Sequence, residues 1–478
     1  MQADRATEIR LFSLKRPHMR AFHYAWLSFF IAFFGWFSIP PLMPTIKQQL
    51  NLTEDQVANS DIASVASAII GRIVVGPLCD HYGGRIVQSV LLVLGAIPVA
   101  AAALATDYVG LMVIRFFIGL VGCSFVATAY WTSVMFSNEV VGSANAIATG
   151  WGNLGAGVTY LVTPLLFDLV TLNGTVGDDI GWRITLLFPA IFMIIIGICL
   201  YYFSDDCPQG NYRDLHKNQA MDGVSRPEED MTLGLLTVVR KPVTWILLIQ
   251  YACSFGVEIQ VHNVLSLYFF EDFKIDECDE EIDHNDCRML SQTQASMISS
   301  CFGLMCIFAR AVGGYASDVA NRKFEMRGRI GVQLIAFTCQ TVFLYLFSQM
   351  KTLKWSIPCL IMFGISAQAC TGSTYGIVPY VCPAHRGATS GIVGAGGNLG
   401  GLAWGFLFKE LRNRAKAFEI LSLFVALATL MSAAIRVEGE SSLWSYEEPL
   451  IASTVPTENI DDRDSFSSAL SDHRMAGR

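Results

Sequence analysis

Long apolar stretches alternate with short polar ones along most of this chain. A stretch of about twenty apolar residues is long enough to cross a hydrocarbon core of roughly 30 Å as a helix. The pattern therefore predicts an all-α, polytopic membrane protein with twelve spans, at about 21–43, 60–80, 86–105, 109–135, 142–168, 182–203, 242–269, 294–317, 329–349, 356–380, 388–408 and 414–436.

Polar segments divide these spans into two sets of six. Residues 204–241 resemble a linker in composition, and the Ser/Asp-rich residues from about 437 onward have the composition of a disordered segment. We expect a cytoplasmic segment 1–20, a six-helix half 21–203, a cytoplasmic linker 204–241, a second half 242–436 and a cytoplasmic tail 437–478.

The composition is typical of a membrane protein, because only 15% of the residues are charged, whereas about 25% are charged in soluble proteins. No cleavage site follows the first apolar run, so the first span is expected to stay as an anchor. Lys and Arg are concentrated before the first span and after the eighth, which predicts that both termini are cytoplasmic. The loop after the seventh span is acidic and is placed outside, as are two glycosylation sequons, at Asn51 and Asn173.

Cysteines and other reactive residues give no sign of an enzyme. Most of the thirteen cysteines lie singly in apolar runs, as small core residues do. Cys278 and Cys287 lie in the acidic outer loop, where a disulfide is plausible and two unpaired thiols are the alternative. We find no metal-ligand cluster or nucleophile–base pattern, and expect no cofactor and no nucleic-acid partner.

Two arginines stand inside apolar spans, in the matching runs RIVVGPLCD (Arg72) and RAVGGYASD (Arg310). An arginine at the centre of a membrane helix costs roughly 2.5–3.5 kcal/mol on insertion scales, so its default interpretation is functional. The same placement twice indicates two parallel halves with a site at their interface. Eight residues, or about 12 Å of helix, separate each arginine from the aspartate that ends its run, so both are expected at one depth.

Two unpaired cations at one depth would repel each other in a low dielectric, and an anion between them would remove that repulsion. A planar oxyanion can accept the forked donors of both guanidiniums. The alternative is that each arginine pairs with a carboxylate of its own half, of which Glu258 is the main candidate.

Aromatic residues at i, i+4 lie on one face of a helix. Tyr251 and Phe255 in the seventh span could wall a flat ligand, with the tyrosine hydroxyl donating, and they match Phe30 and Phe34 in the first span. Ordinary core or lipid-facing packing is the alternative.

Glycine-rich segments also match between the halves: GSANAIATGWGNLGAG at 142–157 and GATSGIVGAGGNLGGL at 387–402. The first contains a dinucleotide-binding pattern, which we reject because that motif requires a preceding strand. Small residues instead let helices approach closely and slide or rock. The aligned Asn153 and Asn398 could donate to an anion or bond across helices. The glycines predicted to pack helices or act in gating are Gly150, Gly152, Gly155, Gly396, Gly397 and Gly400.

Other charged residues suggest a gate and a proton route. Asp80 could sit at a neighbouring helix N-terminus and pair with Arg85, closing the inner side, while simple loop rigidity is the alternative. Arg115 and Glu258 have no counterpart in the other half, which makes them candidates for proton coupling, although structural pairing fits them equally well.

The run G-x-x-x-D-x-x-G-G-R, at 76–85, resembles the signature of the major facilitator superfamily. Together with the paired glycine–asparagine segments and one arginine in each half, the chain resembles the nitrate/nitrite porters, closest to the plant- and algal-type high-affinity nitrate transporters. The resemblance implies that Arg72 and Arg310 clamp nitrate, that Tyr251, Phe255 and Phe125 line the site with Asn153 nearby, and that Phe34 is the residue from the first span.

The same resemblance implies proton symport across the plasma membrane, with nitrite as a second substrate and a small single-span accessory protein as a candidate partner. A nitrate/nitrite exchanger, which needs no proton pathway, is one alternative. A nitrate-sensing receptor with little flux is the other.

Overall fold

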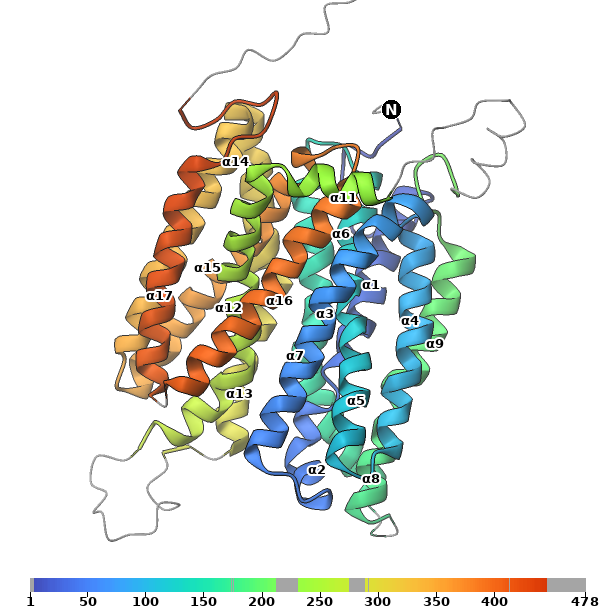
Figure 1. Ribbon diagram of the computed structural model, residues 1–478, viewed down its shortest axis with the longest axis vertical. Coiled ribbons are helices and arrows are strands. Elements are labelled where there is room, and N and C mark those ends of the chain that lie inside the picture. The colour runs from blue at the N-terminus through green and yellow to red at the C-terminus, as the bar shows by residue number, and fades with distance from the viewer. Residues whose placement is uncertain are drawn as a thin grey trace, which may run out of the picture.

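A computed structural model of the chain describes residues 4–172, 174, 176–211, 231–274, 289–290, 292–411 and 413–444. Within these residues the regular elements are helices, and β-pairing is limited to isolated bridges such as Ala6 with Phe136. The helices form two bundles side by side, the first half of the chain in one and the second half in the other (Figure 1).

The first bundle is built from helices joined by short turns. Gly83, at φ 87°, turns the chain between two long helices, and Thr53 caps the first of these with a reciprocal hydrogen-bonded box to Gln56. Its elements are α1 (His18–Trp36), η1 (Pro40–Leu42), α2 (Met43–Gln49), α3 (Glu54–Tyr82), α4 (Gly84–Ala101), η2 (Ala102–Leu104), α5 (Tyr108–Gly119), η3 (Leu120–Cys123), α6 (Ser124–Met135), α7 (Val141–Thr171), α8 (Asp178–Thr185) and α9 (Leu187–Phe203).

The second bundle begins after a short helix, α11 (Met231–Val239). Pro242 starts its first long helix, where its missing N–H costs no hydrogen bond, and Asn413 caps its last. Its elements are α12 (Pro242–Glu271), α13 (Gln292–Leu304), η4 (Met305–Ile307), α14 (Ala309–Gln349), α15 (Leu353–Val381), α16 (Arg386–Glu410), α17 (Arg414–Met431) and η5 (Ser432–Ala434).

Eleven stretches of the described chain are long and apolar enough to cross a membrane, and one of them, Met297–Gln349, has 53 residues. At 1.5 Å per residue that stretch is about 80 Å long, far more than one crossing needs. It contains Glu325, whose non-helical φ of 54° divides α14 into two helices. The longest stretch therefore holds two crossings, which gives the twelve expected. The difference from expectation is local, because residues after Asp318 continue the helix where a loop was predicted.

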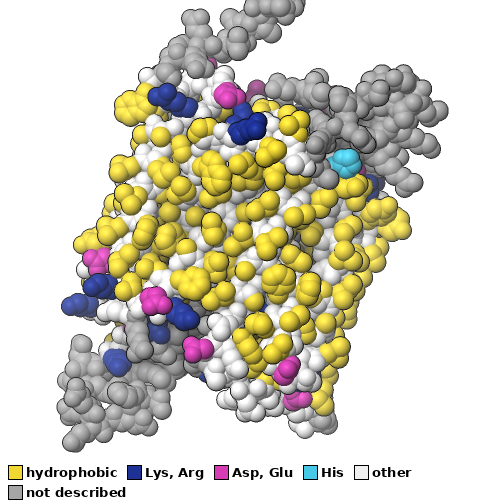
Figure 2. All heavy atoms as spheres, viewed as in Figure 1, with side chains coloured by type: hydrophobic (Ala, Val, Ile, Leu, Met, Phe, Trp, Pro, Cys, Tyr) yellow, Lys and Arg dark blue, Asp and Glu magenta, His cyan; other side chains and the backbone are white. Residues whose placement is uncertain are grey.

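The surface agrees with a membrane environment. Figure 2 shows hydrophobic side chains covering the middle of the molecule, with charged side chains gathered toward its two ends. Large apolar side chains on this surface include Leu94, Ile97, Leu165, Leu169 and Leu427, each more than half exposed. Such a wide exposed apolar surface is stable when lipid covers it.

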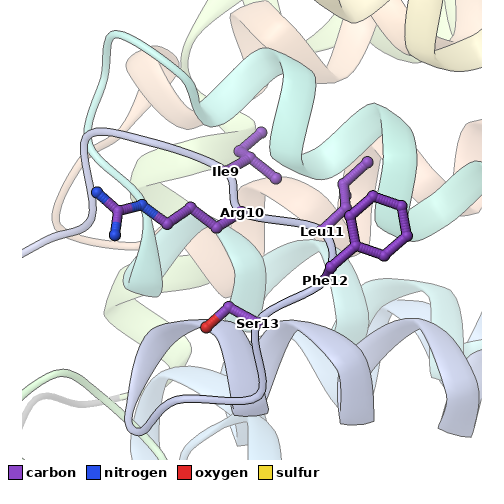
Figure 3. A pocket seen from close by; sticks show the side chains of 5 residues that line it. All are labelled: Ile9, Arg10, Leu11, Phe12 and Ser13. Atoms are coloured by element: carbon purple, nitrogen blue, oxygen red, sulfur yellow. The ribbon is translucent and has the colours of Figure 1, made fainter.

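The N-terminal segment and the described end of the second bundle lie at one end of the molecule, which we call the terminus-bearing end (Figure 1). The residues before and after the α12–α13 connection lie at the opposite end. A shallow hollow on the N-terminal segment is lined by Ile9, Arg10, Leu11, Phe12 and Ser13 and includes neither intramembrane arginine (Figure 3). Cys278, Cys287 and Asn173 lie outside the described residues, as does the tail beyond 444.

Candidate functional site

The two intramembrane arginines meet around one aromatic ring. Arg72 lies in α3 and Arg310 at the start of α14, and both are fully buried. Because Arg72 Cζ is 5.2 Å and Arg310 Cζ 5.8 Å from the centroid of the Phe255 ring, the two Cζ atoms lie within about 11 Å of each other. One arginine from each half therefore reaches the interface between the halves.

Arg72 contacts carbonyls and rings. Its Nε donates to the carbonyl of Gly122 at 3.2 Å and its Nη1 to the carbonyl of Gly394 at 2.7 Å, while its guanidinium lies 5.1 Å from the Phe125 ring centroid. No carboxylate in the described part of the chain pairs with it, and its buried Nη2 has no hydrogen-bond partner. The charge of Arg72 is therefore not neutralised by a neighbouring acid.

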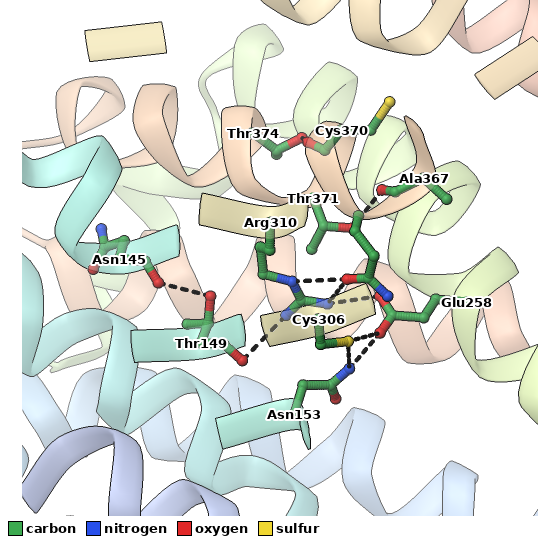
Figure 4. A network of polar contacts seen from close by, with 11 residues as sticks. Asn145, Thr149, Asn153, Glu258, Cys306, Arg310, Ala367, Cys370, Thr371 and Thr374 are labelled. Carbon is green, nitrogen blue, oxygen red and sulfur yellow. Dashed lines mark hydrogen bonds and ion pairs between the residues drawn. The ribbon is translucent and has the colours of Figure 1, made fainter. Parts of the chain in front are cut away.

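Arg310, by contrast, has a carboxylate partner in its own half. Its Nη2 donates to Glu258 Oε2 at 2.6 Å (Figure 4). Its Nη2 and Nε also donate to Gln368 Oε1, at 2.9 and 3.1 Å. Nη1 is 3.4 Å from the carbonyl of Thr149 in the first half. The idea of two unpaired cations is thus wrong for Arg310, which takes the carboxylate pairing named as the alternative.

The two aligned asparagines have different surroundings. Asn153 Nδ2 donates to Glu258 Oε1 and lies 3.4 Å from Cys306 Sγ, so it bonds across the two halves (Figure 4). Asn398 is fully buried, and neither its Nδ2 nor its Oδ1 has a partner.

Aromatic rings fill the space next to Arg72. Tyr251 and Phe255 stack with centroids 5.3 Å apart, and Phe125 stacks on them at 5.7 and 5.9 Å. Tyr375, which the sequence had not marked, lies edge-on to Phe125 at 4.8 Å. From the first helix it is Phe29 whose ring contacts Phe125, at 5.7 Å. Phe34 is also buried in α1, and the carbonyl oxygen of Phe34 is 3.4 Å from the hydroxyl of Thr159.

Several buried polar atoms at this site have no protein partner. Buried polar groups are normally hydrogen-bonded, so each exception calls for an explanation. They include Arg72 Nη2, Tyr251 Oη and Gln368 Nε2, and all three can donate a hydrogen bond. A cluster of free donors beside an unneutralised cation suits a small ligand that only accepts hydrogen bonds, namely an anion.

Sequence reasoning missed Gln368 and Tyr375, both on α15. Their signal was available, because polar side chains within a span are themselves unusual. Arg115, marked for proton coupling, is 5% exposed and pairs with Asp61 of α3 while donating to Ser60 Oγ at 2.8 Å. In this structure its contacts are those of a local ion pair.

At the terminus-bearing end, an aspartate of each half caps a helix of the other. Asp80 accepts from the backbone N–H groups of Gly387 and Ala388, both at 2.9 Å, at the start of α16. Asp318 accepts from Gly142 N at 3.2 Å and from Ser143, at the start of α7. Carboxylates are favoured at helix N-termini by the free N–H groups and the helix dipole. We call these two contacts the latches.

Arginines near the latches differ from expectation. Arg85 pairs with Asp206 at 3.2 Å and donates to the carbonyl of Tyr201, so the expected pairing with Asp80 is replaced by one with the segment that follows α9. Arg329, at the start of the predicted span 329–349, is fully buried and pairs with Asp318 at 2.8 Å. Arg329 follows the break at Glu325, and its guanidinium lies beside Gly142 at the start of α7 and donates to the carbonyl of Asn138.

The glycine segments divide into two sets of contacts. Gly152 and Gly155 face Phe29 and Phe30 of α1, and Gly396 and Gly400 face Leu248 and Ala252 of α12, so these four glycines pack helices within one half. Gly397 lies against the rings of Tyr251 and Phe255 at the site.

A second set joins the halves. Gly150 approaches the carbonyl of Cys306, next to Arg310, and Gly142 approaches Asp318. Gly387 and Gly391 approach the backbone of Gly76 and Arg72 in the same way. A Cβ at these positions would lie within about 2.7 Å of the other half, so the glycines permit this close approach.

We expect Asp318→Asn to weaken the latch at α7. The change removes the charge that holds the α7 N-terminus and the buried Arg329, so the amides of Gly142 and Ser143 should exchange with deuterium at least about 10-fold faster. Hydrogen-exchange mass spectrometry of the peptide around these residues measures this. Asp272→Asn, which breaks a partly exposed ion pair with Arg414 at the opposite end, is the matched control. Unchanged exchange in Asp318→Asn would contradict the latch.

Comparison with known proteins adds sequence and fold relatives. Residues 25–405 match the family model described as Major Facilitator Superfamily. The chain is 37% identical over 405 residues to high affinity nitrate transporter 2.5 of Arabidopsis thaliana, covering 85% of this chain and 76% of that protein. It is 34% identical to nitrate transporter 2.2 of Chlamydomonas reinhardtii, covering 83% and 74% of the two chains. It is 26% identical to the nitrate/nitrite transporter NrtP of Nostoc punctiforme, covering 91% of this chain and 95% of that protein.

Solved structures resemble the chain in fold alone. The E. coli fucose:proton symporter FucP matches with a TM-score of 0.64 and 14% identity, over 87% of this chain and 98% of that one. The proton:xylose symporter XylE matches with a TM-score of 0.58 and 14% identity, over 86% of this chain and 94% of that one.

Proposed function

This chain belongs to the major facilitator superfamily, in the same family as the plant and algal high-affinity nitrate transporters, and we propose that it carries nitrate across a membrane by alternating access. The observation that carries the proposal is the buried, unneutralised Arg72 beside free hydrogen-bond donors. Nitrate is a small planar anion that accepts hydrogen bonds and can lie flat against aromatic rings. Arg72, Tyr251 and Asn398 supply donors, and Phe125 and Phe255 supply the walls.

In this proposal Arg310 clamps the anion from the second half. It comes within reach of the same ring as Arg72, and a guanidinium fork can bind two oxygens of one oxyanion. The two latches hold the halves together at the terminus-bearing end, which we take to be cytoplasmic. Transport then requires both latches to open while the halves rock about the glycine contacts.

We propose that proton symport supplies the driving force for nitrate uptake. Carrying one anion into an inside-negative cell costs about 2.3 kcal/mol per 100 mV, and protons moving with it offset that cost. Nitrite as a second substrate, a plasma-membrane location with both termini cytoplasmic, and a single-span accessory protein stay predictions from the family resemblance. The division of the chain into two six-helix domains with a linker and terminal segments also stays a prediction.

The function is tested with the purified full chain in proteoliposomes. We expect ¹⁵N-nitrate to accumulate when the outside is more acidic than the inside, and a protonophore to abolish that accumulation. Sulfate, a tetrahedral dianion, should not compete. Uptake that requires internal nitrite and ignores the pH gradient would favour an exchanger. Nitrate binding with no flux in either mode would favour a sensor and contradict transport.

A further inference from the structure

Four of the five N–H donors of Arg310 are already used by its neighbours, including both on Nη2. Glu258 and Gln368 take its Nη2 and Nε, and Thr149 lies nearest its Nη1. A nitrate ion therefore cannot take a two-point hold on Arg310 while Glu258 stays in place. Arginine does not lose its proton in proteins, so of the two partners only the carboxylate can change its charge.

We propose that nitrate and the Glu258 carboxylate compete for Arg310, and that one proton on Glu258 releases Arg310 to nitrate. The inference rests on the proposed nitrate transport and deepens it, because it names the group that binds the proton. The proton adds to a carboxylate oxygen of Glu258, the ion pair with Arg310 breaks, and an oxygen of nitrate takes the place of Glu258 Oε2.

Formal charge supports this exchange. Arg72, Arg310 and ionised Glu258 carry a net charge of +1 in a buried site. With one proton and one nitrate bound, two arginines and one nitrate again sum to +1. Nitrate alone would leave the site neutral with two anions competing for one fork, and a proton alone would leave +2. The cost of buried charge therefore opposes binding of a proton alone, and the repulsion of two anions at one fork opposes binding of nitrate alone, so the two ions are expected to bind together.

The groups around Glu258 indicate that Glu258 itself is the residue that binds the proton. Arg310 comes from α14, Cys306 from η4 with its Sγ 3.6 Å from Glu258 Oε1, and the neutral amide of Asn153 from α7. On α12 itself the titratable groups within two turns of Glu258 are Tyr251, Cys253 and His262, and Cys253 is directed toward the carbonyl of Phe424 in α17. Gln368 and Tyr375 of α15 and Asn398 of α16 are uncharged. Among these kinds of group, carboxyl groups and imidazoles have ordinary pKa values below neutral pH, about 4.3 and 6.5, so they can take up a proton there, whereas thiols and phenols, at about 8.5 and 10, already carry theirs.

His262 lies on the outer side of Glu258. It stands four residues further along α12, one turn closer to the end that carries the α12–α13 connection, and on the same helix face. It is partly exposed, whereas Glu258 is 1% exposed. The imidazole of His262 is therefore a titratable group that lies between that end of the molecule and the buried carboxylate of Glu258.

The experiment measures nitrate affinity against pH for the full chain in detergent, and ¹⁵N-nitrate exchange and accumulation in proteoliposomes. If one proton binds with each nitrate, affinity should rise up to 10-fold for each unit by which pH falls, over the range where Glu258 is ionised. Glu258→Gln imitates the protonated acid. It should bind nitrate with no pH dependence and exchange nitrate across the membrane, but its accumulation ratio under a pH gradient should fall to about 1. Asp179→Asn, in an ion pair with Arg183 away from the site, should match the unmodified chain.

The outcomes distinguish a failure of the proposed function from a failure of the proposed role of Glu258. If the unmodified chain neither binds nor exchanges nitrate, the proposed function fails. If that chain works and Glu258→Gln keeps proton-driven accumulation, or loses nitrate binding while folded, the inference is overturned. Should Glu258→Gln not fold, Glu258→Asp decides. Its carboxyl is retracted by one methylene, so the pH at which affinity changes should move, and an unmoved profile overturns the inference.

Discussion

Arg310→Ala is expected to lower nitrate uptake at least about 30-fold. Removing one partner of a buried, hydrogen-bonded charge pair costs 2–5 kcal/mol or more, and each 1.4 kcal/mol is a factor of ten. Arg310→Lys keeps the positive charge but loses the planar fork, so we expect a loss of at least about 10-fold there too. Initial rates of ¹⁵N-nitrate uptake, normalised to protein in the membrane, measure both.

The ion pair with Glu258 complicates the single substitution. Truncating Arg310 leaves a carboxylate buried and uncompensated, which typically destabilises a protein by about 3–5 kcal/mol. The double variant Arg310→Ala/Glu258→Gln removes that charge, so its thermal unfolding temperature should recover toward that of the unmodified chain while uptake stays abolished. Normal uptake in the folded double variant would refute the clamp. A double-mutant cycle over the two positions separates stability from transport.

The spans were predictable because lipid imposes a simple length requirement. Residues 142–168 and 242–269 were expected, and the helices run Val141–Thr171 and Pro242–Glu271. The polar stretch after Asp318 was interpreted as a loop because it is charged. Lysine, arginine and glutamate are also good helix formers, and the chain stays helical there up to the break at Glu325.

The candidate site was only partly predictable, for a related reason. The cost of burying charge singled out Arg72 and Arg310, and it also left Glu258 as the one nearby acid to consider. Which partner each would contact depends on how its helix is rotated. Helices such as α12 are apolar on most sides, so the sequence pattern does not mark one face. Gln368 and the capping role of Asp318 therefore emerged only from the packing.

Gly391→Leu is expected to abolish uptake by preventing the halves from closing. A Cβ at Gly391 would lie 2.5 Å from the backbone oxygen of Arg72 and 3.1 Å from Gly76 Cα. These are backbone atoms, so the clash is relieved only if α3 and α16 move apart. Such a movement displaces Arg72 within the site and pulls Gly387, one turn away, from Asp80. The closed arrangement should therefore become inaccessible, and transport needs the protein to pass through it.

The amides of Gly387 and Ala388, which donate to Asp80, provide a direct readout. In Gly391→Leu they should exchange with deuterium at least about 10-fold faster, together with the loss of ¹⁵N-nitrate uptake. Gly331→Leu is the matched control, since a Cβ at that helical glycine meets nothing within 4 Å and should change neither measurement. Folded Gly391→Leu protein with protected amides and normal uptake would show that close contact between α3 and α16 is dispensable. Because the atoms that the new Cβ would meet are backbone atoms of α3, side-chain repacking alone cannot remove the clash.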